Sequence, residues 1–143
     1  MGLFLLLHMS KTFSYNREEK LKSRKLMEQL FSAGKSFTIY PVKVFYLPIV
    51  EKLDFPVKVG VGTGSRNFKK ATERNRIKRI LREGYRTEKK ILYDYTLSNN
   101  KQVAVFLLYL DKTLPDYKTI KAKMPLIFEK LINQLHEVAA ANT

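Results

Sequence analysis

The stretch from Lys69 to Arg86, which reads KKATERNRIKRILREGYR, constrains the fold more than any other part of the chain. At about 100° per residue, four of its apolar side chains fall on one stripe of a helix: Ile77, Ile80, Leu81 and Tyr85. A stripe of this kind must pack against a core. The stretch therefore predicts an amphipathic helix that lies against the rest of the domain.

The same segment carries an unusual density of positive charge. From Arg66 to Arg86 there are nine basic residues and two acidic ones, so the segment carries 9 − 2 = +7, half of the chain's formal +14. A single such residue is best explained as part of a solvated surface, but so many on one helix repel one another without matching acidic partners. The pattern favours contact with a polyanion. The candidate nucleic-acid-binding residues are Arg66, Lys69, Lys70, Arg74, Asn75, Arg76, Lys78, Arg79, Arg82 and Arg86.

Composition limits the remaining possibilities. A chain of 143 residues with 45% hydrophobic content is long enough for one domain with a buried core. A pI near 10.0 indicates RNA, DNA or an anionic membrane surface as the partner. The sequence lacks cysteine, its two histidines are far apart and its acidic residues are scattered, so we predict no catalytic residue and no metal site. Gly60, Gly62 and Gly64 precede no phosphate-loop Lys-Ser/Thr and are interpreted as strand-end and turn glycines.

The first residues, MGLFLLLHM, form a short apolar run. The run is too short to span a bilayer, and it lacks the basic start and the cleavage site of a secretory signal. We interpret residues 1–12 as a dispensable extension, with a small interfacial anchor as the alternative.

Periodicity predicts seven elements in the order αβββαβα. They are a helix over 23–32 that ends at Gly34, an extended piece over 36–40, strands over 42–49 and 56–63, the basic helix continuing to about residue 93, a strand over 103–110 and a helix after Asp116. The strands over 42–49 and 56–63 are expected to pair as an antiparallel hairpin. Gly84 is expected to kink the basic helix, and Pro125 to kink or restart the last one. The strand over 103–110 is apolar on both faces, which is typical of a central strand. The fold class is α+β, a single-domain sandwich with a mixed central sheet and packed helices.

The run RNRIKR at residues 74–79, followed by Ile80-Leu81-Arg82-Glu83 and Tyr85-Arg86, resembles the signature of the protein subunit of bacterial ribonuclease P. Residues 21–24, 30–36 and 57–61 resemble that family's first helix, turn and third strand. The resemblance covers about residues 13–136, so we expect the family's domain over 13–138 and a short tail over 139–143.

The resemblance implies a fold, a function and partners. The fold would be similar to a ribosomal-protein domain, with a left-handed βαβ crossover around the basic helix. The function would be that of an accessory subunit, inactive alone, in a cytoplasmic ribonucleoprotein endonuclease that removes the 5′ leader from precursor tRNA. The RNA subunit would be the catalyst, using Mg²⁺ held by the RNA and the substrate. The partners would be that catalytic RNA and precursor tRNA, with neither DNA nor a membrane among them.

Two binding surfaces follow from the resemblance. Five residues match the motif that would contact the catalytic RNA: Arg74, Asn75, Arg76, Lys78 and Arg79. Arg82 and Arg86 extend this face by helical angle alone. A cleft between the first helix and the sheet would hold the leader, with Met27, Phe31 and Phe45 at the matching positions. For the two phenylalanines, ordinary core packing is an equally good interpretation.

The chain also departs from the family pattern. Ser65-Arg66-Asn67 supplies one basic residue where two adjacent ones are usual, and Gly62 and Gly64 occupy positions where less flexible residues are usual. We expect Lys69 and Lys70 to compensate for the missing charge.

Three other classes of protein are alternatives. A ribosomal or RNA-assembly protein without a catalytic partner would share the charge and the fold, but would not need RNRIKR or an aromatic cleft. A DNA-binding regulator would need a second helix joined by a short turn. A free-standing nuclease would need clustered carboxylates to hold a metal.

Overall fold

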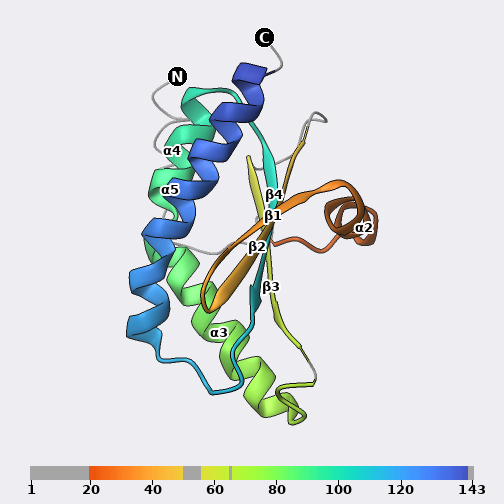
Figure 1. Ribbon diagram of the computed structural model, residues 1–143, viewed down its shortest axis with the longest axis vertical. Coiled ribbons are helices and arrows are strands. Elements are labelled where there is room, and N and C mark those ends of the chain that lie inside the picture. The colour runs from red at the N-terminus through yellow and green to blue at the C-terminus, as the bar shows by residue number, and fades with distance from the viewer. Residues whose placement is uncertain (1–19, 50–55, 65, 142–143) are drawn as a thin grey trace, which may run out of the picture.

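The computed structural model describes residues 20–49, 56–64 and 66–141. The elements are α2 (Arg24–Ala33), β1 (Lys35–Ile39), β2 (Val42–Pro48), β3 (Val57–Thr63), α3 (Ala71–Glu88), α4 (Lys90–Ser98), β4 (Val103–Tyr109) and α5 (Tyr117–Ala141). Helices α3, α4 and α5 cover one face of the sheet, and α2 lies on the other (Figure 1). The predicted α+β sandwich is confirmed, whereas the predicted extension over residues 1–12 lies outside the described residues.

The four strands form one mixed sheet in the order β1-β2-β4-β3. β2 pairs antiparallel with both β1 and β4, and β3 pairs parallel with β4. The predicted hairpin between β2 and β3 is therefore wrong. The strand that separates them is β4, whose residues are apolar on both faces and which takes the central position for that reason.

Parallel pairing of β3 with β4 requires a long connection, which α3 and α4 provide. The left-handed sense of this connection stays a prediction.

The basic helix α3 ends at Glu88, and the second helix α4 starts at Lys90. The helical segment is therefore interrupted at Lys89 and not at Gly84. Gly84 is buried inside α3, where an added Cβ would lie 3.2 Å from side-chain atoms of Ile120 and Met124. This glycine thus allows α3 and α5 to approach closely. At Pro125, α5 continues without restarting.

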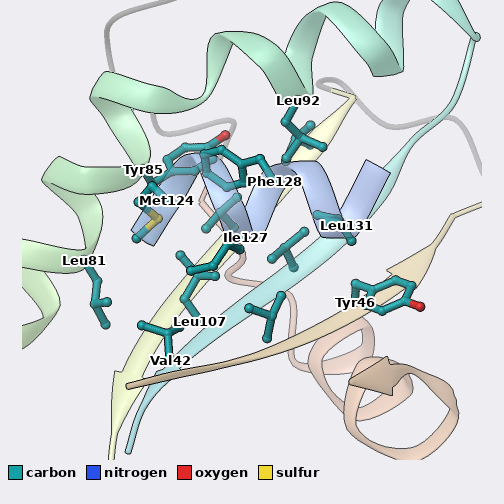
Figure 2. Packing of buried hydrophobic residues seen from close by; sticks show 14 of the residues in the cluster. Val42, Tyr46, Leu81, Tyr85, Leu92, Leu107, Met124, Ile127, Phe128 and Leu131 are labelled. Atoms are coloured by element: carbon teal, nitrogen blue, oxygen red, sulfur yellow. The ribbon is translucent and has the colours of Figure 1, made fainter. Parts of the chain in front are cut away.

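The core lies between the sheet and the three helices α3, α4 and α5. Alternate residues of β2, namely Val42, Val44 and Tyr46, are buried there, as the pattern predicted. The predicted stripe of α3 is confirmed, with Ile77, Leu81 and Tyr85 buried and Ile80 partly buried against the same cluster. Figure 2 shows side chains of α5 filling the space between the sheet and α3. All five predicted apolar residues of α5 are buried: Ile120, Met124, Ile127, Leu131 and Leu135.

Helix α2 lies across the opposite face of the sheet. It starts after Ser23, whose hydroxyl oxygen accepts a hydrogen bond from the backbone N–H of Leu26, and it ends at Gly34. Only Leu30 of this helix is fully buried. Phe45 of β2 and Phe106 of β4 remain partly exposed beside α2. This face of the sheet therefore offers an apolar surface that α2 does not close.

Alanine substitutions at Gly34 and Gly64 form a matched pair that tests how closely the end of α2 packs against the sheet. An added Cβ at Gly34 would collide with the carbonyl oxygen of Leu30 and lie 2.9 Å from that of Tyr46, and backbone atoms cannot move away cheaply. We expect Gly34→Ala to destabilise the domain by about 1–3 kcal/mol, as forced overpacking does. At Gly64 a Cβ would meet nothing within 4 Å, and no glycine of the described residues has positive φ. Gly64→Ala should leave the melting temperature unchanged or slightly raised. Equal melting temperatures for the two variants would show that α2 is seated differently.

Candidate RNA interface

The basic residues predicted from sequence lie on α3 and on the loop before it. Six of them are exposed, namely Arg66, Lys69, Lys70, Arg76, Arg79 and Arg82, and the polar candidate Asn75 is exposed as well. Arg74, Lys78 and Arg86 are partly buried. Because Ile77, Leu81 and Tyr85 on the opposite side of α3 are buried in the core, these cations are presented on a fixed support.

Arg74 is folded back onto the loop that precedes α3. Its Nη1 donates hydrogen bonds to the carbonyl oxygens of Phe68, at 2.8 Å, and Lys69, at 2.7 Å. The helix has no side-chain cap at Lys70, so these bonds help to hold its start. The side chain of Asn67 also donates to the carbonyl of Leu110, at 3.2 Å. Arg74 therefore holds the segment that carries Lys69 and Lys70, besides adding its own charge.

Arg86 is engaged within α3. Its Nη2 lies 2.9 Å from Oε2 of Glu83 in an ion pair, and its Nε donates to the same carboxylate. This hydrogen bond, together with the attraction of the carboxylate, raises the pKa of Arg86 above its usual value. Pairing with Glu83 offsets the charge of Arg86, so this residue adds less to a polyanion-binding face than its helical angle suggested.

An aromatic cluster occupies the face of the sheet beside α2. Phe31 lies edge-on to Phe45, with ring centroids 5.1 Å apart, and edge-on to Phe106, with centroids 5.2 Å apart. Phe31 keeps 49% of its surface exposed, and Nζ of Lys43 lies 5.0 Å from the centre of the Phe45 ring. The structure thus brings Phe31 and Phe45 together at the surface, as the cleft prediction required.

Phe106 was missed from sequence, although a signal was present. Alternation along β4 places it on the face opposite Val105 and Leu107, and it pairs in register with Phe45. Gly60 and Gly62 leave room for its ring, because an added Cβ would lie 2.9 Å and 2.8 Å from ring atoms. Gly60 lies in the middle of β3, so its interpretation as a strand-end or turn glycine is wrong, whereas Gly62 lies next to the last residue of the strand and Gly64 directly follows it.

A pocket of about 150 Å³ adjoins the aromatic cluster. Met27 of α2 and Phe106 of β4 line it, together with Arg82 of α3 and the two lysines Lys20 and Lys22. Met27 therefore lines a pocket beside Phe106, and its contact with a leader stays a prediction. Arg82 was assigned to the outer face of α3 by angle, whereas the structure places it at the cleft.

Within the described parts of the chain, no group of three or more His, Asp or Glu side chains is placed to hold a metal ion. Among the helices described, none has the length and apolar character needed to cross a membrane.

Comparison with known proteins identifies relatives over most of the chain. Residues 15–131 match the family model described as Ribonuclease P. The ribonuclease P protein component of Porphyromonas gingivalis is 30% identical over 113 residues, covering 79% of this chain and 82% of the relative. That of Chlorobium phaeobacteroides is 28% identical over 130 residues, covering 82% and 88%. The solved RNase P protein from Thermotoga maritima has the same fold, with a TM-score of 0.62 and 22% identity, over 78% of this chain and 96% of that one.

Arg74 and Arg76 provide a test of the loop contact. Arg74→Lys keeps the charge but loses the guanidinium that reaches two carbonyl oxygens, so we expect a loss of about 1–2 kcal/mol in stability and faster amide exchange around residues 68–71. Arg76→Lys, at an exposed position, should change neither quantity. Melting curves and hydrogen exchange measure the effect, and an Arg74→Lys protein with wild-type exchange would refute the role of Arg74 in holding the loop.

Proposed function

Because this chain belongs to the ribonuclease P protein family, we propose that it binds the catalytic RNA of that ribonucleoprotein and assists removal of the 5′ leader from precursor tRNA. The observation that carries the proposal is α3, whose apolar stripe is buried while its outer face presents exposed cations. Arg and Lys on a fixed support neutralise phosphates and release counterions, which gives salt-dependent affinity.

The catalytic RNA contacts the outer face of α3 and the loop before it. Arg76 and Arg79 supply forked donors for phosphate oxygens, and Asn75 can both donate and accept hydrogen bonds. Lys69 and Lys70 lie on the segment that Arg74 holds, so their charges are presented in a defined place. Lys78 flanks this face.

The single-stranded leader lies on the aromatic cluster beside α2. Bases of single-stranded RNA stack on aromatic rings, and neighbouring cations contact the backbone. Phe31 offers an exposed ring here, and Lys43 supplies a cation next to Phe45. This cluster favours the proposed function over that of a ribosomal or RNA-assembly protein, which has no leader to bind.

Phosphodiester hydrolysis is assigned to the RNA subunit, with Mg²⁺ held by the RNA and the substrate. When bound there, the metal activates water and stabilises the charge that develops on phosphate oxygens. This chain binds both RNAs, orients the leader and reduces the repulsion between the two polyanions. We place this activity in the cytoplasm, where the resemblance implies it.

The rate of precursor tRNA cleavage, measured as a function of Mg²⁺ concentration, tests whether the RNA subunit and not the protein carries out hydrolysis. The protein alone should not cut precursor tRNA at any Mg²⁺ concentration, and adding it should let the catalytic RNA work at lower Mg²⁺. The reason is that the protein's cations screen repulsion that Mg²⁺ must otherwise screen. The benefit should shrink as Mg²⁺ or monovalent salt rises. Cleavage by the protein alone that disappears on replacement of one Asp or Glu would instead make the chain a nuclease.

Phe31→Ala should weaken binding of precursor tRNA to the holoenzyme and spare mature tRNA, because only the precursor has a leader to stack. Stacking is worth about 1–3 kcal/mol per base. Phe45→Ala should act in the same direction, with some loss of stability since Phe45 is partly buried.

Leu126→Ala is the matched control for Phe31→Ala. Leu126 is 50% exposed on α5, which covers the other face of the sheet, and its loss should leave both affinities unchanged. If the Phe31 variant lost affinity for both RNAs equally, the aromatic cluster would not be the leader site.

A further inference from the structure

We propose that Tyr40, in the turn between β1 and β2, stacks on an unpaired base of the catalytic RNA and so extends the surface that binds this RNA beyond α3. The inference rests on the proposed function and adds a contact outside both α3 and the aromatic cluster beside α2. Two observations carry it together. Tyr40 keeps 60% of its surface exposed, and its turn is joined to the basic loop over residues 66–70 that precedes α3.

The turn that carries Tyr40 and the basic loop lie at the same end of the sheet (Figure 1). Val42, at the start of β2, pairs with Tyr109 at the end of β4, and Tyr109 pairs with Thr63 at the end of β3. Neighbouring strands are about 4.8 Å apart, so about 10 Å separate the start of β2 from the end of β3. A short single-stranded segment of RNA can therefore contact the turn and the loop at once.

Hydrogen bonds through Leu110 join the two segments. The backbone N–H of Leu110 donates to the carbonyl oxygen of Pro41, at 2.8 Å, and the side-chain amide of Asn67 donates to the carbonyl oxygen of Leu110, at 3.2 Å. Phe68 of the loop also lies beside Tyr109, with ring centroids 6.2 Å apart. The turn is thus placed next to the loop by contacts within the protein, before any RNA binds.

The Tyr40 side chain is held at its hydroxyl end and is otherwise largely open to solvent. The hydroxyl donates a hydrogen bond to the carboxylate of Asp111. The pKa of Asp111 is lowered first by the backbone N–H of Lys112, which donates at 2.7 Å, and then by the Tyr40 hydroxyl. Aromatic surface that stays in water is removed from it when a base stacks on the ring, and this removal favours binding.

Exposed cations accompany the ring. Lys112 is exposed in the segment after β4, and Arg66, Lys69 and Lys70 are exposed in the basic loop. An aromatic ring beside cations is the combination that binds unpaired nucleotides, because the ring stacks on a base while the cations neutralise phosphates. Bases inside a duplex already stack on one another, so the nucleotide that Tyr40 contacts is an unpaired one.

The catalytic RNA fits this position better than the leader does. The leader is assigned to Phe31 and Phe45, which meet on the face of the sheet beside α2. Tyr40 lies instead in a turn at the end of the sheet, and its turn is tied to the loop that starts α3. Because that loop belongs to the surface proposed for the catalytic RNA, the same RNA is the one within reach of Tyr40.

Variants of Tyr40 separate stacking from charge. Tyr40→Leu keeps apolar bulk but loses the aromatic ring, and it should lower the affinity of the protein for the catalytic RNA by about five- to tenfold, as loss of one stacked base does. The salt dependence of binding should stay at the wild-type slope, because no cation is lost. Tyr40→Phe keeps the ring and should retain wild-type affinity. Ile91→Ala is the matched control, since Ile91 is 46% exposed on α4, and it should change neither quantity.

Chemical probing of the catalytic RNA locates the base. The wild type and Tyr40→Phe should protect an unpaired nucleotide that stays reactive in the complex with Tyr40→Leu. Wild-type affinity of Tyr40→Leu, or a loss of affinity without such a nucleotide, would overturn the inference. A selective loss of precursor tRNA binding would also overturn it and assign Tyr40 to the leader. The proposed function fails separately if the wild-type protein binds the catalytic RNA no better than an unrelated RNA of the same length.

Discussion

The packing of α3 against the rest of the domain is the constraint on which the structure depends. Ile77 and Leu81 are fully buried, and Gly84 lets α5 approach closely enough to cover them. Burial of such side chains is worth about 1.5–3 kcal/mol each, which offsets the mutual repulsion of the cations on the outer face. One helix therefore serves as core element and as charged surface, and the position of each cation is set by the core.

The same packing determines where the aromatic cluster lies. α3 and α4 connect two parallel strands, so β4 is placed between β2 and β3 with one face turned to the core. Its other face carries Phe106, which rests over Gly60 and Gly62 of β3 and contacts Phe31 of α2. The core and the aromatic cluster thus lie on opposite faces of one strand. Arg82 of α3 lines the pocket beside the cluster, together with residues of β3.

Local pattern predicted the helices and strands of the described residues approximately, except that α4 was taken as the end of the basic helix. The agreement follows because burial with a period of 2 or 3.6 is a local property. Pairing was predicted less well: β2 and β3 are neighbours in sequence, but the more apolar β4 displaced that hairpin. The break at Lys89 and the pairing of Arg86 with Glu83 depend on neighbouring side chains, which periodicity does not specify. The exposure of Phe31 likewise depends on how α2 crosses the sheet, which no local pattern records.

We propose that exposed cations on the outer face of α3 bind RNA phosphates, and a salt titration tests this claim most directly. The affinity of the protein for the catalytic RNA is measured against salt concentration for the wild type and for the double variant Arg76→Gln and Arg79→Gln. Each lost phosphate contact should reduce the slope of log affinity against log salt by about 0.7–0.9, so the double variant should lose about 1.5 units at an unchanged melting temperature. A wild-type slope in the double variant would contradict the claim.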